Sequence, residues 1–308
     1  LSLVVVGNAI SRGNPELEAV LERKIRHCSL PEAIREHFLW GARSIVVAGT
    51  HGKTTTTSLV GWLLADGGLD PTVLIGGIAL NFGEQGSSYR VGHGRDFVIE
   101  GDEYDSAFFD KTAKFLKYLP DIVVVNNIEF DHADIYPDLE AIKLAFRRLV
   151  NLVPRRGLLV LGADNADALA LKANARCKVE TFGLSNGCDW QAHDLQVTST
   201  STRFGVRRAG TTVGTFEVPL LGAYNDLILD RDANKTAAKF VHEKIAEIVK
   251  DPDVAKKLSP TTYPIGAKRI CVDTGYYATF NRDNVSLVDL TEEPIERVTP
   301  DGVKTGAK

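Results

Sequence analysis

The sequence predicts an α/β fold whose central part binds phosphate and contains a mostly parallel sheet flanked by helices. Several short strands are apolar at successive positions and alternate with helical patterns, as in a sheet that is buried on both faces. One of these strands runs into a glycine-containing turn that carries a lysine and opens a helix, which is the arrangement of a phosphate-binding loop.

Strand and helix patterns alternate along the first half of the chain. An apolar run at 3–6 ends at Gly7 and precedes a helical pattern with Pro15 in its first turn. Further strands are expected at 45–48, 72–75, 97–99, 122–125 and 158–161, and further helices from about Thr54 to the glycines at 67–68 and over 139–152.

The pattern changes between Trp190 and Pro219. Polar and β-branched residues alternate there, and Arg208-Ala-Gly-Thr211 predicts a hairpin turn. We therefore expect an antiparallel edge region beside the parallel sheet.

Composition restricts the class of partner. The chain has 308 residues, a net charge of −4 with both signs interspersed, and no apolar run long enough to cross a bilayer. We expect small-molecule partners, no nucleic acid, no membrane and a cytoplasmic location.

Four cysteines without C-x-x-C spacing predict free thiols: Cys28, Cys177, Cys188 and Cys271. Because the chain begins in a strand-like run and contains no methionine, we expect it to be a fragment.

The predicted phosphate loop lies between a strand that ends at Ala48 and the helix that follows it. Backbone N–H groups there would point at an anion, Lys53 would add a positive charge, and the Thr54 hydroxyl would be available to Mg²⁺. Val47 replaces the first glycine of the usual motif, and His51 is either a ligand contact or a simple loop residue. The residues expected to bind ATP or GTP are Gly49, Thr50, His51, Gly52, Lys53, Thr54 and Thr55.

Two acidic segments follow neighbouring predicted strands at the edge where α/β sheets place ligands. The first, Glu100-Gly-Asp-Glu-Tyr-Asp105, has four acidic residues in six positions, a density that calls for a cation such as Mg²⁺ unless the segment is a solvated turn. The second contains Glu129 and His132, and this histidine is either a metal ligand or a solvated loop residue. Together with the lysine loop, these segments favour metal-assisted phosphoryl transfer.

Three segments resemble the Mur ligase family: Gly49-Thr-His-Gly-Lys-Thr-Thr55, Glu100 to Asp110, and Asn126 to Asp134. The resemblance extends over about residues 1–221. It implies an ATP-dependent ligase of cell-wall metabolism that joins UDP-N-acetylmuramate to the tripeptide L-Ala-γ-D-Glu-meso-diaminopimelate through an acyl phosphate, in peptidoglycan recycling. It also implies a remnant of a UDP-sugar-binding domain at 1–43 and an ATP-binding domain at 44–221.

The resemblance also implies roles for individual residues. Lys53 would contact the β- and γ-phosphates, and Thr54 would bind one Mg²⁺ that Glu100 or Glu103 shares. His132 would hold a second Mg²⁺. Asn81 would contact the UDP-sugar, unless Gly76 to Asn81 is only a glycine turn after a strand.

The tail at 222–308 resembles a fragment of a Baeyer–Villiger flavin monooxygenase, in which Lys268 and Arg269 would face NADPH phosphate and flavin peroxide. Since no G-x-G-x-x-G motif occurs in the chain, we interpret these two residues as vestigial. The chain is then a chimera of two families, by gene fusion or by an assembly error. We expect an amphipathic helix with Val241, Ile245 and Ile248 on one face, but poor packing of the tail.

Three functions follow from these patterns. The first is the ligase. The second is a nucleotide-binding fragment without ligase turnover, because the family's C-terminal ligase domain is not recognised in the sequence. The third is an oxidoreductase fragment.

Overall fold

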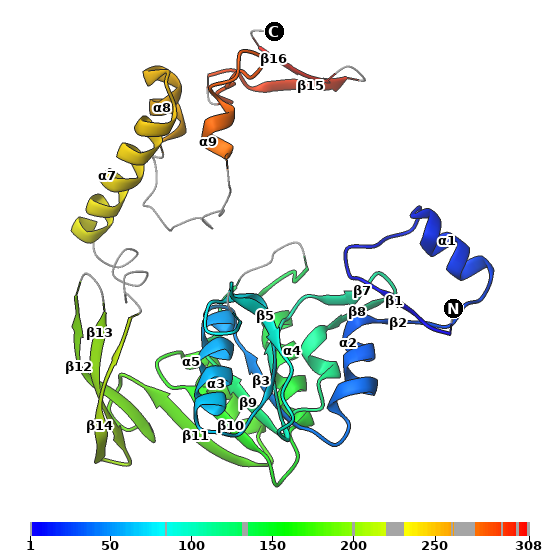
Figure 1. Cartoon of the computed structure of the whole chain (residues 1–308), viewed down its shortest axis with the longest axis vertical. Helices are drawn as coiled ribbons and strands as arrows, with labels where there is room; N and C mark the ends of the chain where they lie inside the picture. The colour runs from blue at the N-terminus through cyan, green and yellow to red at the C-terminus, as the bar shows by residue number, and fades with distance from the viewer. Residues whose placement is uncertain are drawn as a thin grey trace. The chain divides into compact units, whose positions relative to one another are not determined.

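The computed structural model describes residues 2–83, 85–130, 135–198, 201–219, 231–259, 261, 275–290, 292–299 and 302–306 (Figure 1). It contains two compact units. The first consists of Leu1–Asp194 and Phe204–Phe216, and the second of Leu195–Arg203 and Glu217–Lys308. In the part of the chain that is described, no helix is both long and apolar enough to span a bilayer.

The first unit begins with a small βαβ motif. Strand β1 (Val4–Val6) pairs in parallel with β2 (His27–Ser29), and helix α1 (Pro15–Glu22) connects them. The Asn14 side chain caps α1 by accepting hydrogen bonds from the amides of Glu16 and Leu17, which confirms the predicted helix start. A capping box between Ser29 and Glu32 starts α2 (Leu30–Ile34), which continues into a π-helical turn, η1 (Arg35–Leu39).

The described strands of the main sheet follow the spatial order β14-β13-β12-β11-β10-β9-β3-β6-β4-β5. Their bounds are β3 (Arg43–Ala48), β4 (Thr72–Ala79), β5 (Ser87–Arg90), β6 (Asp96–Gly101), β9 (Ile122–Val125), β10 (Leu158–Gly162), β11 (Lys178–Gly183), β12 (Trp190–Val197), β13 (Thr202–Arg208) and β14 (Thr211–Val218). From β12 through β11, β10, β9, β3 and β6 to β4 the neighbouring strands are parallel, whereas β5 is antiparallel to β4. This confirms the predicted mostly parallel sheet.

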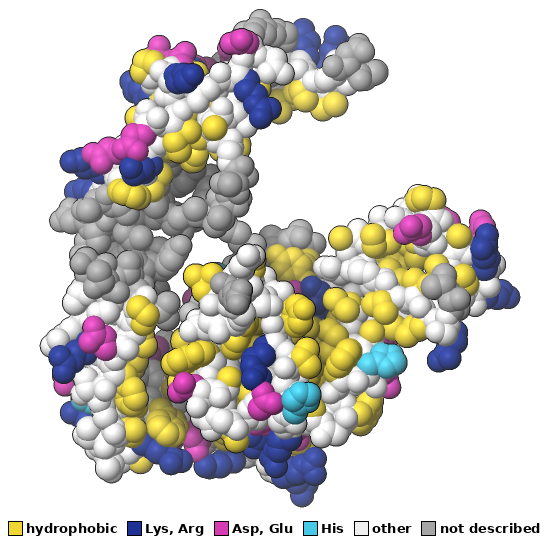
Figure 2. All heavy atoms as spheres, viewed as in Figure 1, with side chains coloured by type: hydrophobic (Ala, Val, Ile, Leu, Met, Phe, Trp, Pro, Cys, Tyr) yellow, Lys and Arg dark blue, Asp and Glu magenta, His cyan; other side chains and the backbone are white. Residues whose placement is uncertain are grey.

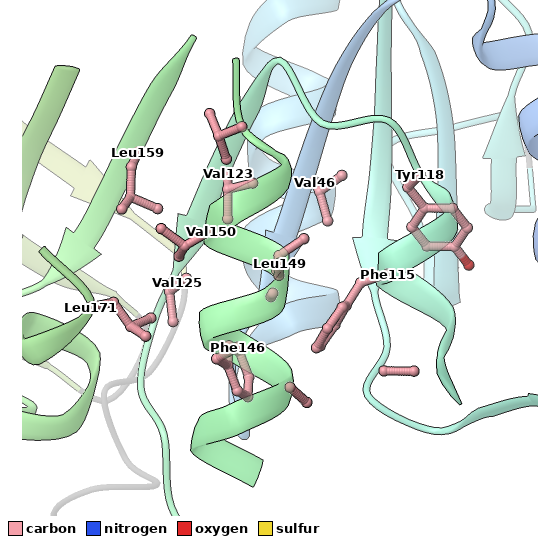
Figure 3. Close-up of a cluster of buried hydrophobic side chains, with 14 of the residues drawn as sticks. Val46, Phe115, Tyr118, Val123, Val125, Phe146, Leu149, Val150, Leu159 and Leu171 are labelled. Atoms are coloured by element: carbon pink, nitrogen blue, oxygen red, sulfur yellow. The ribbon is translucent and has the colours of Figure 1, made fainter. Parts of the chain in front are cut away.

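Helices cover both faces of the parallel strands. Alternate residues of each strand point to opposite faces of the sheet and therefore belong to two separate cores. Ile45 and Val98 pack in one core with Val60 and Leu64 of α3 (Lys53–Asp66). Val46 and Ile99 belong to the opposite core, which contains the buried face of α4 (Leu139–Leu152). In Figure 3, Phe146, Leu149 and Val150 of α4 lie against strand residues that include Val46, Val123 and Leu159.

Several short elements complete the first unit. They are β7 (Asp105–Ala107), β8 (Asp110–Ala113), the 3₁₀ turn η2 (Lys114–Lys117), α5 (Ala166–Ala170) and the 3₁₀ turn η3 (Leu171–Asn174). Strands β7 and β8 form an antiparallel hairpin that begins at Asp105, the last residue of the first acidic segment. The sequence analysis did not predict this hairpin, since the segment lacks an apolar alternation.

In the predicted antiparallel edge region, the hairpin turn is confirmed, and the pairing of its first strand is corrected. A two-residue turn with positive φ at Ala209 (47°) and Gly210 (81°) joins β13 to β14, as a type I′ hairpin requires. Strand β12, however, starts as a parallel neighbour of β11, with Trp190 opposite Phe182. The antiparallel part therefore begins after this pair.

The second unit contains α7 (Arg231–Ile248), α8 (Pro252–Leu258), α9 (Tyr276–Thr279) and the hairpin of β15 (Ile295–Thr299) and β16 (Gly302–Thr305). Its core cluster consists of Ile245, Val249 and Ala255, with Val241 and Phe280 packed against it. The predicted apolar face is wrong at Ile248, which is 43% exposed, because Val249 takes the inward position. Phe240 and Tyr276 are also exposed.

The surface is mixed in charge, as composition predicts. On the face shown in Figure 2, acidic and basic side chains both occur over each of the two units. The described cysteines Cys28, Cys177 and Cys188 are free thiols, whereas Cys271, Lys268 and Arg269 lie outside the described residues.

Candidate nucleotide-binding site

The predicted loop forms at the carboxyl end of β3 and leads directly into α3. Gly49 has φ of +136° and Gly52 has φ of +77°, both in the region that disfavours other residues. A Cβ on Gly49 would lie 3.1 Å from the Asn126 backbone nitrogen. A Cβ on Gly52 would lie 3.2 Å from Asn126 Nδ2, so both glycines are required by the backbone conformation of the loop and by the space around it.

Two asparagines that follow β9 hold the loop. The Thr50 amide donates to the Asn127 carbonyl (3.0 Å), and the His51 amide donates to Asn127 Oδ1 (2.8 Å). Asn126 Nδ2 donates to the His51 carbonyl (3.2 Å) and to the Thr56 hydroxyl (3.1 Å). The sequence analysis included these asparagines in a motif but assigned them no role, although polar amides directly after a buried strand were a signal.

The start of α3 presents amide donors. Among the described residues, the amides of Gly52, Lys53 and Thr54 have no hydrogen-bond acceptor. The first amides of any helix lack an intrahelical partner, and the helix dipole adds positive potential at the same point. This end of α3 is suited to bind an anion such as phosphate.

Lys53 lies inside the loop and contacts Glu103. Its Nζ atom is 2.7 Å from Glu103 Oε2 and 3.0 Å from Oε1, and it also donates to the carbonyls of Gly49 (2.9 Å) and Thr50 (3.3 Å). The lysine side chain is 12% exposed and the glutamate side chain 2%. The Tyr136 hydroxyl donates to the Glu103 carbonyl oxygen (2.7 Å), and burial together with the charge of Glu103 raises the pKa of Tyr136.

Glu100 has different contacts. The Thr54 hydroxyl donates to Glu100 Oε1 (3.0 Å), and the Gly76 amide donates to Oε2 (2.7 Å). Two ligand oxygens in neighbouring positions of a Mg²⁺ octahedron are about 2.9 Å apart when each metal–oxygen distance is about 2.1 Å. The oxygens of Thr54 and Glu100 therefore fit the donor set of Mg²⁺.

The remaining acidic residues of the first segment, Asp102 and Asp105, are paired with lysines, and so is Asp110 five residues farther on. Lys114 Nζ is 2.6 Å from Asp102, Lys111 Nζ is 2.8 Å from Asp105, and Lys117 Nζ is 2.6 Å from Asp110. This corrects the argument that so dense a cluster needs a metal ion, because protein cations supply most of the compensating charge. Within the described residues, no group of three or more His, Cys, Asp or Glu side chains could hold a metal.

The second acidic segment reaches the loop through Glu129. Its amide donates to the Thr50 hydroxyl (2.8 Å), and its carboxylate lies 3.4 Å from His51 Nε2. Both of these side chains are more than half exposed. His132 lies outside the described residues.

Two further residues that were predicted to contact ligands lie at the surface. Asn81 is exposed in the turn after β4, and Thr55 is exposed on the first turn of α3. A cavity of about 240 Å³ lies beside Glu100, with Asn8, Gly76 and Lys114 among its lining residues. The sequence analysis did not single out Lys114 or Tyr136.

The sheet and the lysine loop define an α/β protein of the phosphate-loop class. The sequence matches the Mur ligase middle domain over residues 47–226, more than half of the chain. The chain therefore belongs to the Mur ligase family.

Two relatives resemble this chain over most of its length. The UDP-N-acetylmuramate--L-alanyl-gamma-D-glutamyl-meso-2,6-diaminoheptandioate ligase of Haemophilus influenzae is 41% identical over 223 residues, which are 72% of this chain and 48% of that protein. The crystal structure of the UDP-N-acetylmuramate:L-alanyl-gamma-D-glutamyl-meso-diaminopimelate ligase from Neisseria meningitides superposes with a TM-score of 0.65 at 38% identity, over 73% of this chain and 70% of that one. The chain spans about half the length of the curated relatives it matches.

A second likeness is local. The FAD-bound crystal structure of OTEMO is 54% identical over 27% of this chain and 16% of that one, with a TM-score of 0.26. A score this low supports no conclusion about the fold of the tail.

Proposed function

We propose that this chain carries the ATP site of a ligase that joins UDP-N-acetylmuramate to the tripeptide L-Ala-γ-D-Glu-meso-diaminopimelate. The observation that carries the proposal is the pair of neighbouring contacts Lys53–Glu103 and Thr54–Glu100 at the start of α3. The names of the two relatives supply the substrates.

The triphosphate of ATP would lie at the amides of Gly52, Lys53 and Thr54, with the Lys53 ammonium on its β- and γ-phosphates. Gly49 and Thr50 would shape the loop. His51 and Thr55 would flank it. The low exposure of Lys53 strengthens its attraction to phosphate, because water screens a buried charge less.

Thr54 and Glu100 would hold Mg²⁺, which would neutralise the charge that develops during phosphoryl transfer. Two protein ligands suit Mg²⁺ because it usually takes its other ligands from phosphates and water. His132 is proposed to hold a second ion.

The acid substrate would approach from the cavity beside Glu100, whose lining includes Lys114. A carboxylate oxygen of the lactyl group would attack the γ-phosphorus, and ADP would leave. The amine of the tripeptide would then attack the acyl carbon, and phosphate would leave. Asn81 is proposed as a further substrate contact, and residues 1–43 as the remnant of the domain that binds the UDP-sugar.

Titration with a non-hydrolysable ATP analogue and Mg²⁺ tests the nucleotide site. Lys53→Ala should abolish binding, because the variant loses the cation of the loop. Lys111→Ala is the matched control, since Lys111 is a surface lysine whose side chain is 70% exposed. Unchanged affinity in Lys53→Ala would contradict the proposal.

Phosphate release tests the reaction. Release that requires both UDP-N-acetylmuramate and the tripeptide is expected. Phosphate release or ATP binding that is independent of both substrates would identify a nucleotide-binding fragment without ligase turnover. Phosphate release that requires L-alanine in place of the tripeptide would show that L-alanine is the amino substrate.

We also propose that residues 222–308 derive from a different protein, a flavin monooxygenase, so that Lys268 and Arg269 have no function here. The sequence resemblance described above motivates this proposal. Sequencing the parent locus across codons 215–235 tests it, since an uninterrupted single-family reading would exclude a junction. Flavin absorbance of the purified protein would instead indicate that the tail still binds its cofactor.

A further inference from the structure

We propose that Glu103 is a positioning residue that holds the Lys53 ammonium and competes with the triphosphate for it, while Glu100 alone of the two serves the metal. This inference rests on the proposed ATP site. It concerns two carboxylates, only three positions apart in the sequence, that sequence reasoning could not distinguish.

Protein oxygens surround the Lys53 ammonium group. An ammonium group has three N–H donors, and four acceptor oxygens lie within 3.3 Å of Nζ: two from Glu103 and one each from the carbonyls of Gly49 and Thr50. A phosphate that is to bind Lys53 must therefore replace at least one of these oxygens or share a donor with it.

Burial makes the Glu103 contact strong. A carboxylate that is 2% exposed has lost nearly all of its water, so the buried ion pair with Lys53 compensates its charge. The hydrogen bond from Tyr136 to the Glu103 carbonyl holds the backbone of this residue in place. Glu103 is thus a fixed anion at the side of the loop.

The two carboxylates face different groups. Both oxygens of Glu103 are within 3.0 Å of Lys53 Nζ, whereas the oxygens of Glu100 contact the Thr54 hydroxyl and the Gly76 amide. A Mg²⁺ ion on the same carboxylate oxygens as an ammonium group would be repelled by its positive charge. A Mg²⁺ ion on Glu103 would be in that position, and one on Glu100 beside Thr54 would not.

The charge of Glu103 then opposes nucleotide binding in two ways. It holds Lys53 in its contact with Glu103, and it repels the negatively charged phosphates at short range. Glu103→Gln keeps the shape and removes the charge. This substitution should therefore tighten nucleotide binding, which loss of a merely structural contact would not do.

The experiment is a titration of a non-hydrolysable ATP analogue into the wild-type chain and into Glu103→Gln, Glu100→Gln and Glu140→Gln, each with and without Mg²⁺. Glu140 is the matched control because its side chain on α4 is 69% exposed. We expect Glu103→Gln to bind about tenfold more tightly, which corresponds to about 1.4 kcal/mol, and to keep the wild-type gain from Mg²⁺. Glu100→Gln should lose most of that gain, and Glu140→Gln should match the wild type.

Other outcomes separate the proposals. Loss of the Mg²⁺ gain in Glu103→Gln would identify this residue as a metal ligand and overturn the inference, and so would unchanged or weaker binding. Absence of binding by the wild-type chain would instead refute the proposed ATP site. If Glu103→Gln does not fold, as judged by its melting curve, Glu103→Asp replaces it. Its shorter side chain should weaken the Lys53 contact and tighten binding by a smaller factor, and weaker binding would overturn the inference.

Discussion

The central sheet and the C-terminal helices bury apolar side chains in different ways. In the sheet, strands from distant parts of the sequence lie side by side, and helices cover both faces, so residues such as Val46, Val123 and Phe146 are fully buried. In the tail, Ile245 and Val249 of α7 and Ala255 of α8 form a small cluster, while Phe240 of the same helix α7 is 60% exposed.

This difference explains where the candidate site lies. The phosphate loop emerges from β3, which has β6 on one side and β9 on the other. Glu100 lies near the end of β6, and Asn126 and Asn127 directly follow β9, so these contacts of the loop are positioned by the two paired strands. A site built in this way is more rigid than one on the tail helices could be.

The largest effect is expected for Phe146→Ala. This substitution would leave a cavity between α4 and the sheet and should reduce the free energy of unfolding by about 3–5 kcal/mol. Chemical denaturation followed by far-UV circular dichroism measures it. A loss below about 1 kcal/mol would show that this core is no better packed than the tail.

Ile245→Ala should lower the stability of the second unit by about 2–4 kcal/mol, since it removes the most buried side chain of a small cluster. The affinity for the ATP analogue should not change. Amide hydrogen exchange should show faster exchange in α7 and α8 only. Faster exchange in β3 or β6 would mean that the two cores unfold together.

Two helix caps offer a matched pair. Asn165 accepts from the Ala168 amide at the start of α5 and also from the Ile128 amide, and Asp251 accepts from the Asp253 and Val254 amides at the start of α8. Replacing either by alanine should cost about 1 kcal/mol. The Asn165→Ala loss should appear in global unfolding, because Asn165 also contacts the segment after β9. The Asp251→Ala loss should appear only as faster amide hydrogen exchange in the tail. If both variants changed global unfolding and amide exchange equally, the expected difference between the sheet and the tail would be contradicted.

The smallest effect concerns acid stability. Hydrogen bonds from the Thr181 side chain and amide lower the pKa of Asp189 below its ordinary value of 3.8. A lowered folded-state pKa means that this stabilisation is present above pH 3.8 and is lost as the pH falls through the folded-state value. Asp189→Asn should thus lower stability at pH 7 slightly and flatten its decline in acid. Parallel pH profiles for both proteins would refute this.

Much of the architecture could be predicted because its signals are local. The bounds of α4 and β9 agree with the apolar patterns at 139–152 and 122–125, and the glycine-lysine turn identified the loop at the start of α3. Such patterns depend on the periods of helices and strands, which each segment reveals by itself. The β7–β8 hairpin was missed because its residues are held by ion pairs and main-chain bonds rather than by an apolar period.

The sequence by itself determined the phosphate loop, the family and those helices and strands that have an apolar period, since each depends on residue types at fixed spacing along the chain. Only the tertiary structure decided the partners: Glu103 for Lys53, Glu100 for Thr54, and the lysines for the remaining acidic residues. These partners depend on sheet register and on burial. The contacts of Glu103 and Glu100 join segments 50 and 46 residues apart in the sequence, whereas the lysine–aspartate pairs join residues 6 to 12 positions apart, and no helix or strand period encodes either kind.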